Sequence, residues 1–517
     1  MLIILPGHLQ VSGVTTWAIR AIKGLRERSI QAGIIVHCGQ GESIPEFLLP
    51  YVVGVVEDAP SMDSLSGCVD TLVPVYLDAI KRMNSITKKP VIVSPNLHGD
   101  CYGAIAAIAQ DHPELIRVAA WIHSDNDYDI AVCAHYQQMI HSIVPVSSEL
   151  GAKASSALPD RSADVIHIPH GVDVSTKLSK RSSLKNRPIR LLYTGRVEEY
   201  QKRISALPLL CEQLENSGVQ HELRIVGDGP AMPQLIEQSH GRVSIELLGS
   251  IPPDQINKHL QWADVWVLPS RFEGQSIAML EAMAMGCVPM ITRIQSGAGD
   301  TVIHMQSGIC IDAGWDTPTD HIAVDMCNAI ESLSEAQIKS LSLGAHQISL
   351  DHHRTSVHID AIVAIIEKLE QMPERPWPGE KRAAYTAPPG ELSGSTPHDA
   401  AARMRECLES LQGKSVLIFG SGQHTKDLAS TIENTDIHIA GIIDDNQILA
   451  GNTILGSRIY EPHMIKHLGA TELIISSYIH QESIWKNRAT LEAQGVRVHR
   501  LYPVDDLADD TDDVSTC

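Results

Sequence analysis

The sequence predicts an α/β protein built from three doubly wound units, and three observations support this fold class. The chain has 517 residues, more than one ordinary hydrophobic core holds. Short apolar runs alternate with amphipathic, helix-like runs in three separate series, which is typical of parallel sheets covered by helices. A proline- and glycine-rich stretch at 372–397 divides the second series from the third.

The first unit is expected over residues 1–174. LIIL, TTWAIRAIKGLRER and AGIIVH read as a strand, a helix and a second strand. A helix-like run at 103–110 lies among further strands, which are expected at 91–95, 118–123, 143–147 and 164–169. The basic, serine-rich segment 175–188 is interpreted as a solvated linker.

The second unit is expected over 188–371. Its strands are predicted at 189–195, 222–227, 243–249, 264–270 and 287–292. Helical segments from about Asp320 to Gln371 are expected to close it. A linker at 372–398 follows, with no apolar stripe that could pack.

The third unit is expected over 399–517. Its strands are predicted at 415–420, 438–444, 472–477 and 496–502. The acidic tail is interpreted as a solvated run of like charges.

Composition restricts the partners and the compartment. With 41 basic and 62 acidic residues the net charge is −21, which argues against nucleic acid and leaves room only for weak peripheral membrane contact. The ten cysteines form no CxxC pair and are interpreted as free thiols in a reducing compartment. The N-terminal apolar run breaks at Pro6-Gly7, so it is read as a strand and not a signal peptide. A cytoplasmic location is expected; the oligomeric state is left open.

The stretch RFEGQSIAMLEAMAMG (271–286) carries two carboxylates, Glu273 and Glu281, around the start of a predicted helix that Ser276 could cap. A helix N-terminus beyond the carboxyl end of a parallel strand suits a phosphate. Carboxylates beside it could accept hydrogen bonds from ribose and sugar hydroxyls, which fits a nucleotide-sugar. On this stretch alone, a surface glutamate plus a helix glutamate paired with a lysine is an equal alternative.

Two more segments favour the nucleotide-sugar. YTGRVEEYQKRISAL (193–207) ends a strand at Gly195 and places Arg196 and Lys202 at the same sheet edge, where cations could neutralise a diphosphate. The alternative for each is an ordinary surface cation. ELRIVGDGP (222–230) ends a strand at Gly227, where a ring could approach the backbone closely.

Together, GRVEEYQKR, LRIVGDGP, VSIELLGSIP and ADVWVLPSRFEGQSIAMLEAMAMGCVP resemble the retaining glycosyltransferases of the GT-B fold, family four. The resemblance covers residues 1 to about 370 and places the family's E-x7-E motif on Glu273 and Glu281. It implies two Rossmann-like domains facing across a cleft, an acceptor-side domain followed by a nucleotide-sugar donor domain.

The resemblance also implies roles for residues of the donor domain. Arg196 and Lys202 would grip the diphosphate, Glu281 would bind the ribose, and Glu273 would address the donor sugar. Further binding positions are implied beside the phosphate, at Gly274, Gln275 and Ser276, and beside the base, at Gly249 and Ser250.

In the first domain, the resemblance places Gly13 near the donor phosphate and His123 in the cleft facing the sugars. A strand-end histidine taken alone is more often structural. IPHGVD resembles the family's hinge, with His170 where asparagine is commoner. Two departures are visible. Ser12-Gly13 replaces paired glycines, and Gly274-Gln275-Ser276 replaces a Gly-Phe-Gly run, which leaves the sugar identity open.

The implied reaction is transfer of a sugar from a nucleoside-diphosphate sugar, with UDP favoured, to a hydroxyl of a glycan, lipid-linked, protein or small-molecule acceptor. The anomeric configuration would be retained through front-face displacement, with Glu273 assigned to sugar recognition. No cofactor and no metal are expected. A GT-B-like scaffold that partners another glycosylation enzyme is the alternative.

Three local patterns are interpreted as unrelated to function. Asp125-Asn126-Asp127 is read as a polar loop, and Gly413-Lys414-Ser415 lacks the preceding glycine of a P-loop. His352, His353 and His358 lack zinc-site spacing with cysteines and are expected on a solvated helix.

The third unit has two-thirds of a dinucleotide fingerprint: Gly420-x-Gly422 after a strand, with Thr425 in place of the third glycine, and Asp444 after the next strand. These residues are weak nucleotide-binding candidates. The run IAGIIDDNQILAGNTILG resembles the N-terminal domain of sugar acetyltransferases of the sialic-acid and bacillosamine type, without the acyltransferase repeats. An accessory domain without chemistry of its own is favoured. Ligand binding and an assembly role stay open.

Overall fold

The structure is a computed structural model. It describes residues 1–5, 12–38, 43–57, 69, 71–96, 99–125, 127–178, 181–199, 201–293, 297–314, 317–378, 400–435, 437–444, 451, 453–477, 481–486 and 488–502. The chain forms two compact units, one holding the first two sheets and the other the third. The predicted fold class, two Rossmann-like domains plus a smaller α/β domain, is confirmed.

The first sheet has six parallel strands in the order β3-β2-β1-β4-β5-β6. The strands are β1 (Leu2–Leu5), β2 (Gly33–His37), β3 (Val52–Val56), β4 (Val91–Pro95), β5 (Ile116–Ile122) and β6 (Ile140–Pro145). The helices are α1 (Gly13–Glu27), α2 (Val73–Thr87), α3 (Gly99–Asp111), α4 (Asp127–His135) and α5 (Ser148–Ala157). Strand order reverses between β1 and β4, and ligands of such parallel sheets bind beyond the carboxyl ends of the strands at this kind of reversal.

The second sheet is also parallel, in the order β12-β11-β10-β7-β8-β9. Its strands are β7 (Ile189–Thr194), β8 (His221–Val226), β9 (Ile245–Gly249), β10 (Val265–Leu268), β11 (Val288–Arg293) and β12 (Ile309–Asp312). Its helices are α6 (Ala206–Asn216), α7 (Met232–Ser239), α8 (Pro253–Trp262), α9 (Ile277–Ala284), α10 (Thr319–Glu331) and α11 (Glu335–His352). Here strand order reverses between β7 and β10.

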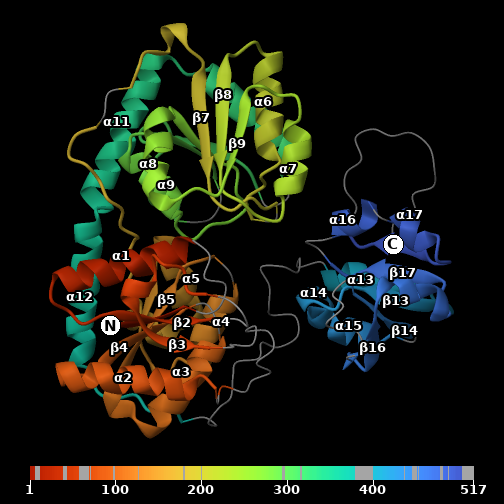
Figure 1. The fold of residues 1–517 in the computed structure, drawn as a ribbon, viewed down its shortest axis with the longest axis horizontal. Coiled ribbons are helices and arrows are strands. Elements are labelled where there is room, and N and C mark those ends of the chain that lie inside the picture. Colours follow the sequence, from red (N-terminus) through yellow and green to blue (C-terminus); the bar gives the residue numbers. More distant parts are fainter. Residues whose placement is uncertain are drawn as a thin grey trace. The chain divides into compact units, whose positions relative to one another are not determined.

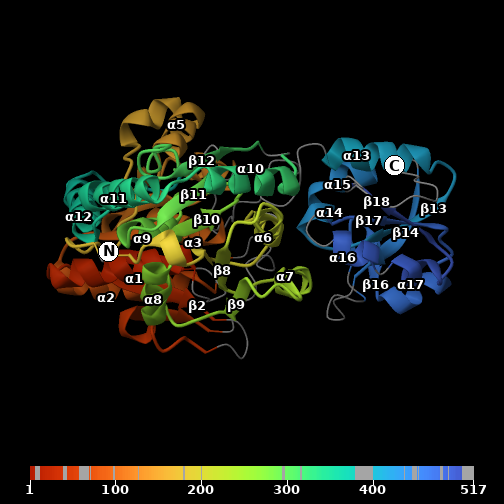
Figure 2. The ribbon, with the colours of Figure 1, turned by 90° about the horizontal axis from the view of Figure 1, so that it is seen from above.

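The last helix of this unit, α12 (Thr355–Glu370), packs against the first domain, although the sequence placed it in the second. It lies alongside α1 (Figure 1, Figure 2) and also contacts β4. The fit against α1 is tight, because a Cβ at Gly24 would lie 2.6 Å from Cγ1 of Ile359. Ion pairs of 2.6 Å, Arg28 with Asp360 and Lys89 with Glu370, flank the contact.

The predicted linker begins with a packed segment. Arg117 Nε donates to the carbonyl of Met372 at 2.8 Å, and the buried ring of Trp377 lies 5.3 Å from that of Tyr136. Residues 372–378 therefore extend the contact of α12 with the first domain. The rest of the predicted linker, up to residue 398, lies outside the described residues.

Two stretches of chain run side by side between the two domains. Val172, in the hinge that follows β6, donates from its backbone N–H to the carbonyl of His353 at 2.7 Å. The backbone N–H of Thr355 donates to the carbonyl of Val172 at 2.9 Å. These two hydrogen bonds join the hinge to the turn between α11 and α12.

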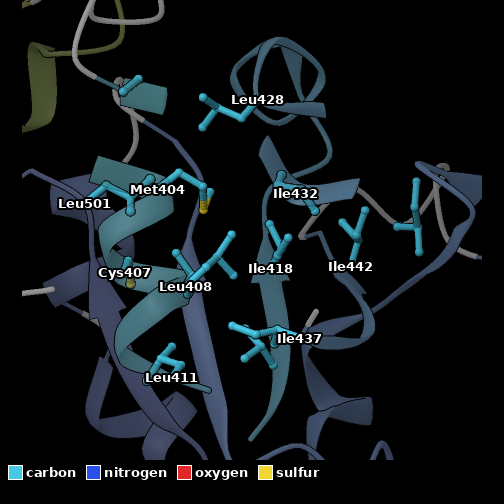
Figure 3. Close-up of a cluster of buried hydrophobic side chains, with 14 residues drawn as sticks. Met404, Cys407, Leu408, Leu411, Ile418, Leu428, Ile432, Ile437, Ile442 and Leu501 are labelled. Atoms are coloured by element: carbon cyan, nitrogen blue, oxygen red, sulfur yellow. The ribbon is translucent and has the colours of Figure 1, made fainter. Parts of the chain in front are cut away.

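The third sheet has the order β15-β16-β14-β13-β17-β18, with only the β15–β16 pair antiparallel among the described strands. The strands are β13 (Ser415–Phe419), β14 (His438–Ile443), β15 (Thr453–Ile454), β16 (Ser457–Tyr460), β17 (Glu472–Ile475) and β18 (Arg497–Arg500). The helices are α13 (Ala400–Ser410), α14 (Gln423–Asp427), α15 (Ala429–Glu433), α16 (Gln481–Lys486) and α17 (Arg488–Glu492). Met404 and Leu408 of α13 pack on Ile418 and Ile442 to form one side of its core (Figure 3).

Among the helices that the structure describes, none is both long and apolar enough to cross a bilayer.

Candidate active site

The loop between β10 and α9 brings a predicted carboxylate and a predicted cation together. Glu273 is buried, with 6% of its surface exposed, and accepts a 2.7 Å hydrogen bond from Ser270 Oγ. The same carboxylate forms an ion pair with the Lys202 ammonium, which is also mostly buried. Ser276 caps α9 as predicted, because its side chain accepts from the backbone N–H of Met279 at 3.3 Å.

Lys202 is held by a turn that the sequence did not single out. The buried carboxylate of Glu198 accepts from the backbone N–H groups of Gln201 and Lys202 at 3.0 Å. Gln201 joins this turn to the Glu273 loop, donating from Nε2 to the carbonyl of Phe272 at 3.0 Å and accepting from the backbone N–H of Arg271 at 2.7 Å. The two loops thus form one hydrogen-bonded edge, which fixes Lys202 beside Glu273.

Arg196 lies at the rim of this edge. Its side chain is 63% exposed and its Nη2 is 3.8 Å from the Glu198 carboxylate. Its backbone carbonyl accepts a 2.6 Å hydrogen bond from the hydroxyl of Tyr193. The backbone of Arg196 is therefore anchored while its guanidinium faces solvent, and its part in diphosphate binding stays a prediction.

Three predicted glycines lie at neighbouring strand ends of the same edge. A Cβ at Gly227, where φ is +137°, would lie 1.8 Å from the carbonyl oxygen of Gly195. Gly227 also donates to the carbonyl of Gly249 at 2.8 Å. Close packing of backbones therefore requires Gly227, a different reason from the approach of a ring. Gly249 and the exposed Ser250 border open space.

Glu281 pairs with a residue of the other domain. It lies in the second turn of α9, and its carboxylate forms an ion pair with Arg20 of α1; the two side chains are 26% and 20% exposed. The sequence offered ribose or a lysine as its partner and did not single out Arg20. That residue could not be found from local spacing, because it reaches Glu281 only through the pairing of the two domains.

The first domain meets the Glu273 loop directly. A Cβ at Gly274 would lie 1.9 Å from the carbonyl oxygen of His123. Gln275 is buried, and its Oε1 accepts from the backbone N–H of His170 at 2.6 Å. Gly13 is the first residue of α1, with open space at its Cβ and the Ser12 side chain as cap. The loop thus lies between the donor domain and the predicted cleft residues.

Hydrogen bonds define the tautomer of His123. Asn96 donates from Nδ2 to the carbonyls of Ile4 and Ser94, at 3.0 Å each, so its Oδ1 is left as an acceptor. His123 Nε2 lies 3.1 Å from that oxygen and must carry the proton. Burial lowers the pKa of His123 to about 3, with a further contribution from His358, so the ring is neutral at physiological pH.

The prediction of a solvated histidine helix is wrong for His353 and His358, which are buried. His358 Nδ1 donates to the carbonyl of Pro169 at 2.7 Å, so its Nε2 accepts from Trp17 Nε1 at 3.0 Å. His353 Nδ1 lies 3.1 Å from the carbonyl of His170. These contacts tie α12, α1 and the hinge together. They were invisible in the sequence because Trp17 is 341 residues from His358.

The four histidines near the hinge are held neutral. Burial lowers the pKa of His353 and of His358 to about 4 and that of His170 well below its usual value, with neighbouring histidines and Arg20 adding to the effect. The rings of His123 and His170 stack at 5.5 Å, and Trp17 packs edge-on against His123 at 4.6 Å. Within the described part of the chain, no group of three or more His, Cys, Asp or Glu is arranged to hold a metal ion.

In the third domain the predicted residues also lie together. Gly420, with φ of +109°, follows β13, and Gly422 precedes α14. The Asp444 carboxylate, at the end of β14, accepts from the backbone N–H and the hydroxyl of Ser421 at 2.8 and 2.6 Å. Thr425 donates to the carbonyl of Gly420 at 2.6 Å, so the hydroxyl that replaces the third glycine closes the turn.

Comparison with known proteins shows what the second sheet is similar to. The family model described as "Glycosyl transferases group 1" matches residues 188–334, which contain Arg196, Lys202, Glu273 and Glu281. Residues 188–334 are therefore similar to the group 1 glycosyltransferases. Residues 412–498 match another family, described as "C2185-like, N-terminal". This match does not confirm the resemblance of the third domain to sugar acetyltransferases, which stays a prediction.

Relatives of the group 1 domain have described activities. The putative colanic acid biosynthesis glycosyltransferase WcaL of Salmonella typhimurium is 28% identical over 209 residues, 37% of this chain and 50% of that protein. The GDP-mannose-dependent alpha-(1-6)-phosphatidylinositol monomannoside mannosyltransferase of Mycobacterium tuberculosis is 27% identical over 221 residues, 39% of this chain and 54% of that protein. The chain thus spans about half the length of these relatives.

Solved structures match both domains of the first unit. HepE from Anabaena in complex with UDP-glucose superposes with a TM-score of 0.55 at 14% identity, covering 71% of this chain and 99% of that one. The lipopolysaccharide outer core galactosyltransferase WaaB, in its apo form, gives a TM-score of 0.53 at 17% identity over 71% and 99%. At this identity the likeness shows the GT-B fold of the first unit.

Proposed function

We propose that the chain is a retaining glycosyltransferase that moves a sugar from a nucleoside-diphosphate sugar to a hydroxyl of a carbohydrate-containing or other acceptor. The observation that carries the proposal is the ion pair of Lys202 and Glu273 at the N-terminus of α9. A buried cation beside a capped helix start is suited to a diphosphate, and the adjacent carboxylate is suited to sugar hydroxyls.

When the donor binds, Lys202 and Glu273 would each contact the donor in place of each other. The diphosphate would take the ammonium of Lys202, with the free N–H groups at the start of α9 and the exposed guanidinium of Arg196 completing its neutralisation. Glu273 would then accept hydrogen bonds from the sugar. Glu281 would bind the ribose. Because these groups offset the charge of the leaving group, the proposed reaction requires no metal and no cofactor.

The proposed chemistry is a front-face displacement that retains the anomeric configuration. The bond between the anomeric carbon and the phosphate oxygen breaks, and the acceptor oxygen bonds to that carbon on the same face. The acceptor proton passes to the departing phosphate oxygen. The protein contributes orientation and charge stabilisation, and Glu273 recognises the sugar without acting as the base.

His123 would contact the sugars as a hydrogen-bond acceptor. Its Nε2 is committed to Asn96, which leaves Nδ1 with a lone pair, and that atom has no hydrogen-bond partner among the described residues. A pKa of about 3 makes the ring a poor general acid or base near neutral pH. We therefore assign His123 to accepting a sugar hydroxyl.

UDP is the favoured nucleotide, and the third domain is assigned an accessory role. HepE, which shares the fold, was solved with UDP-glucose, whereas the mycobacterial relative is named as GDP-mannose-dependent. The nucleobase of the donor is therefore left to the donor panel described next.

The test is release of nucleoside diphosphate from UDP-, GDP-, dTDP- and ADP-sugars without acceptor, using the full chain. Slow hydrolysis of one donor is expected, falling at least about hundredfold in Lys202→Ala, because a charged group at the leaving phosphate contributes several kcal/mol. Lys414→Ala, which removes a lysine of the third domain paired with Glu472, is the matched control. Failure to bind or hydrolyse any donor would refute the transferase and favour the scaffold.

A further inference from the structure

The pairing of Arg20 with Glu281 links the two domains at the proposed ribose site. Arg20 lies on the second turn of α1, and Glu281 lies on the second turn of α9. The two helices contact each other across the domain boundary. The ion pair therefore exists only when the first domain lies against the donor domain as it does in this structure.

The contact involves one nitrogen of the Arg20 guanidinium and one oxygen of the Glu281 carboxylate. Nη2 of Arg20 pairs with Oε1 of Glu281. A carboxylate has two oxygens and about four lone-pair positions, so a single N–H bond leaves Oε2 able to accept hydroxyl groups. Arg20 can thus hold the carboxylate in one orientation without occupying it. With 26% of the Glu281 side chain exposed, that orientation would otherwise not be fixed.

A second observation shows that Arg20 can donate a further hydrogen bond at this place. Its Nη1 is buried and has no hydrogen-bond partner among the described residues. A buried guanidinium N–H without an acceptor is costly, and a ligand oxygen would satisfy it. Arg20 also lies near the hinge histidines, where its charge adds to the burial that lowers the pKa of His170 and His358.

From these contacts we propose that Arg20 is a positioning residue for nucleotide recognition. It orients Glu281 toward the ribose of the donor and offers Nη1 to an oxygen of the same nucleoside. The first domain thereby completes the ribose site of the second, so ribose recognition depends on the closed arrangement of the domains. This inference rests on the proposed function, because it assigns the ribose to Glu281.

Arg20 is proposed to act on the nucleoside and not on the diphosphate, so the test compares a ligand that has the nucleoside with one that lacks it. The full chain is titrated calorimetrically with UDP, GDP, dTDP and ADP, and the nucleotide bound most tightly by the wild type is used for the variants. Inorganic pyrophosphate, which lacks ribose, is the second probe. Arg20→Ala is expected to weaken nucleotide binding about tenfold, the scale of one lost charge-assisted contact, and to leave pyrophosphate binding unchanged.

Three further variants make the result specific. Arg20→Lys keeps the charge and should recover part of the affinity. Arg20→Ala in a Glu281→Ala background should cause a smaller loss than in the wild type, because no carboxylate is left to orient and only the Nη1 contact is removed. Arg28→Ala is the matched control at the C-terminal cap of the same helix, since Arg28 pairs with Asp360 of α12.

Each outcome decides one question. Equal nucleotide binding by the wild type and Arg20→Ala would overturn the inference while leaving the proposed function intact. An equal loss of pyrophosphate binding would also overturn it, because that result indicates general damage to the site. If the wild type binds no nucleotide, the proposed function fails and the inference fails with it.

Discussion

Substitution of Gly274 by alanine tests the contact between the Glu273 loop and the first domain. The added Cβ would lie 1.9 Å from the carbonyl oxygen of His123 and 2.7 Å from its carbonyl carbon. These are backbone atoms of the residue after β5, so no side-chain rotation can relieve the clash. Cβ contacts below 3.0 Å essentially do not occur, so the loop must move away by about 1 Å, the difference between 3.0 and 1.9 Å.

A displacement of this size would act on turnover more than on nucleotide binding. Misplacement of reacting groups by about 1 Å costs on the order of a hundredfold in rate. The diphosphate contact proposed for Lys202 comes from the donor domain itself, and the Arg20–Glu281 pair proposed for the ribose lies between α1 and α9 and not in the shifted loop. We therefore expect kcat of Gly274→Ala to fall about hundredfold, while the affinity for nucleoside diphosphate stays within about threefold.

The assay is steady-state nucleotide release with the donor identified by the panel, together with calorimetric nucleotide binding. Gly151→Ala in α5 is the matched control, since its Cβ would meet only Cγ of Pro145, the last residue of β6, at 3.5 Å, which is an ordinary contact. A kcat for Gly274→Ala within twofold of the wild type would refute the reasoning. It would mean that the approach of the loop to His123 is not part of the reactive arrangement.

Two predictions concern stability. Asp264 is buried and bonds both terminal nitrogens of Arg187, at 2.6 and 2.9 Å, so Asp264→Asn should cost about 3 kcal/mol of unfolding free energy in urea; an unchanged urea midpoint would contradict this. Because burial lowers the pKa of His358 from 6.5 to about 4, the folded state binds fewer protons than the unfolded state, and stability is full above pH 6.5 and declines as pH falls toward 4. His358 alone should contribute about 2 kcal/mol of this loss between pH 7 and 5. The free energy of unfolding of His358→Gln in urea should therefore depend less on pH than that of the wild type. Equal pH dependence of the two proteins would disprove the effect.

Most of the fold followed from local patterns. Central strands such as β7 and β10 are mostly apolar and were predicted to within one or two residues at each end. The strands β3, β12 and β15 were not predicted from the sequence. They lie at sheet edges, where side chains are only partly buried or the strand is too short to show an alternating pattern. The apolar face of α12 was visible, but nothing in its periodicity says which domain covers it.

Part of the candidate site could likewise be predicted from the sequence, and part could not. Glu273 and Lys202 are 71 residues apart, yet both follow strands of one parallel sheet, so their meeting at its carboxyl edge was predictable. Arg20 joins Glu281 from another domain, 261 residues away, and no local rule connects the two. His358 was misjudged for a related reason, because a histidine is as often exposed as buried until its partner is known.

Nucleotide binding by the donor domain is tested most directly by calorimetry of nucleoside diphosphate with three forms of the full chain: the wild type, Glu281→Ala and Asp444→Ala. We expect one site of micromolar or tighter affinity that Glu281→Ala weakens at least about tenfold and Asp444→Ala leaves unchanged. Binding that survives in Glu281→Ala and is lost in Asp444→Ala would place the nucleotide in the third domain and refute a nucleotide site at Glu281.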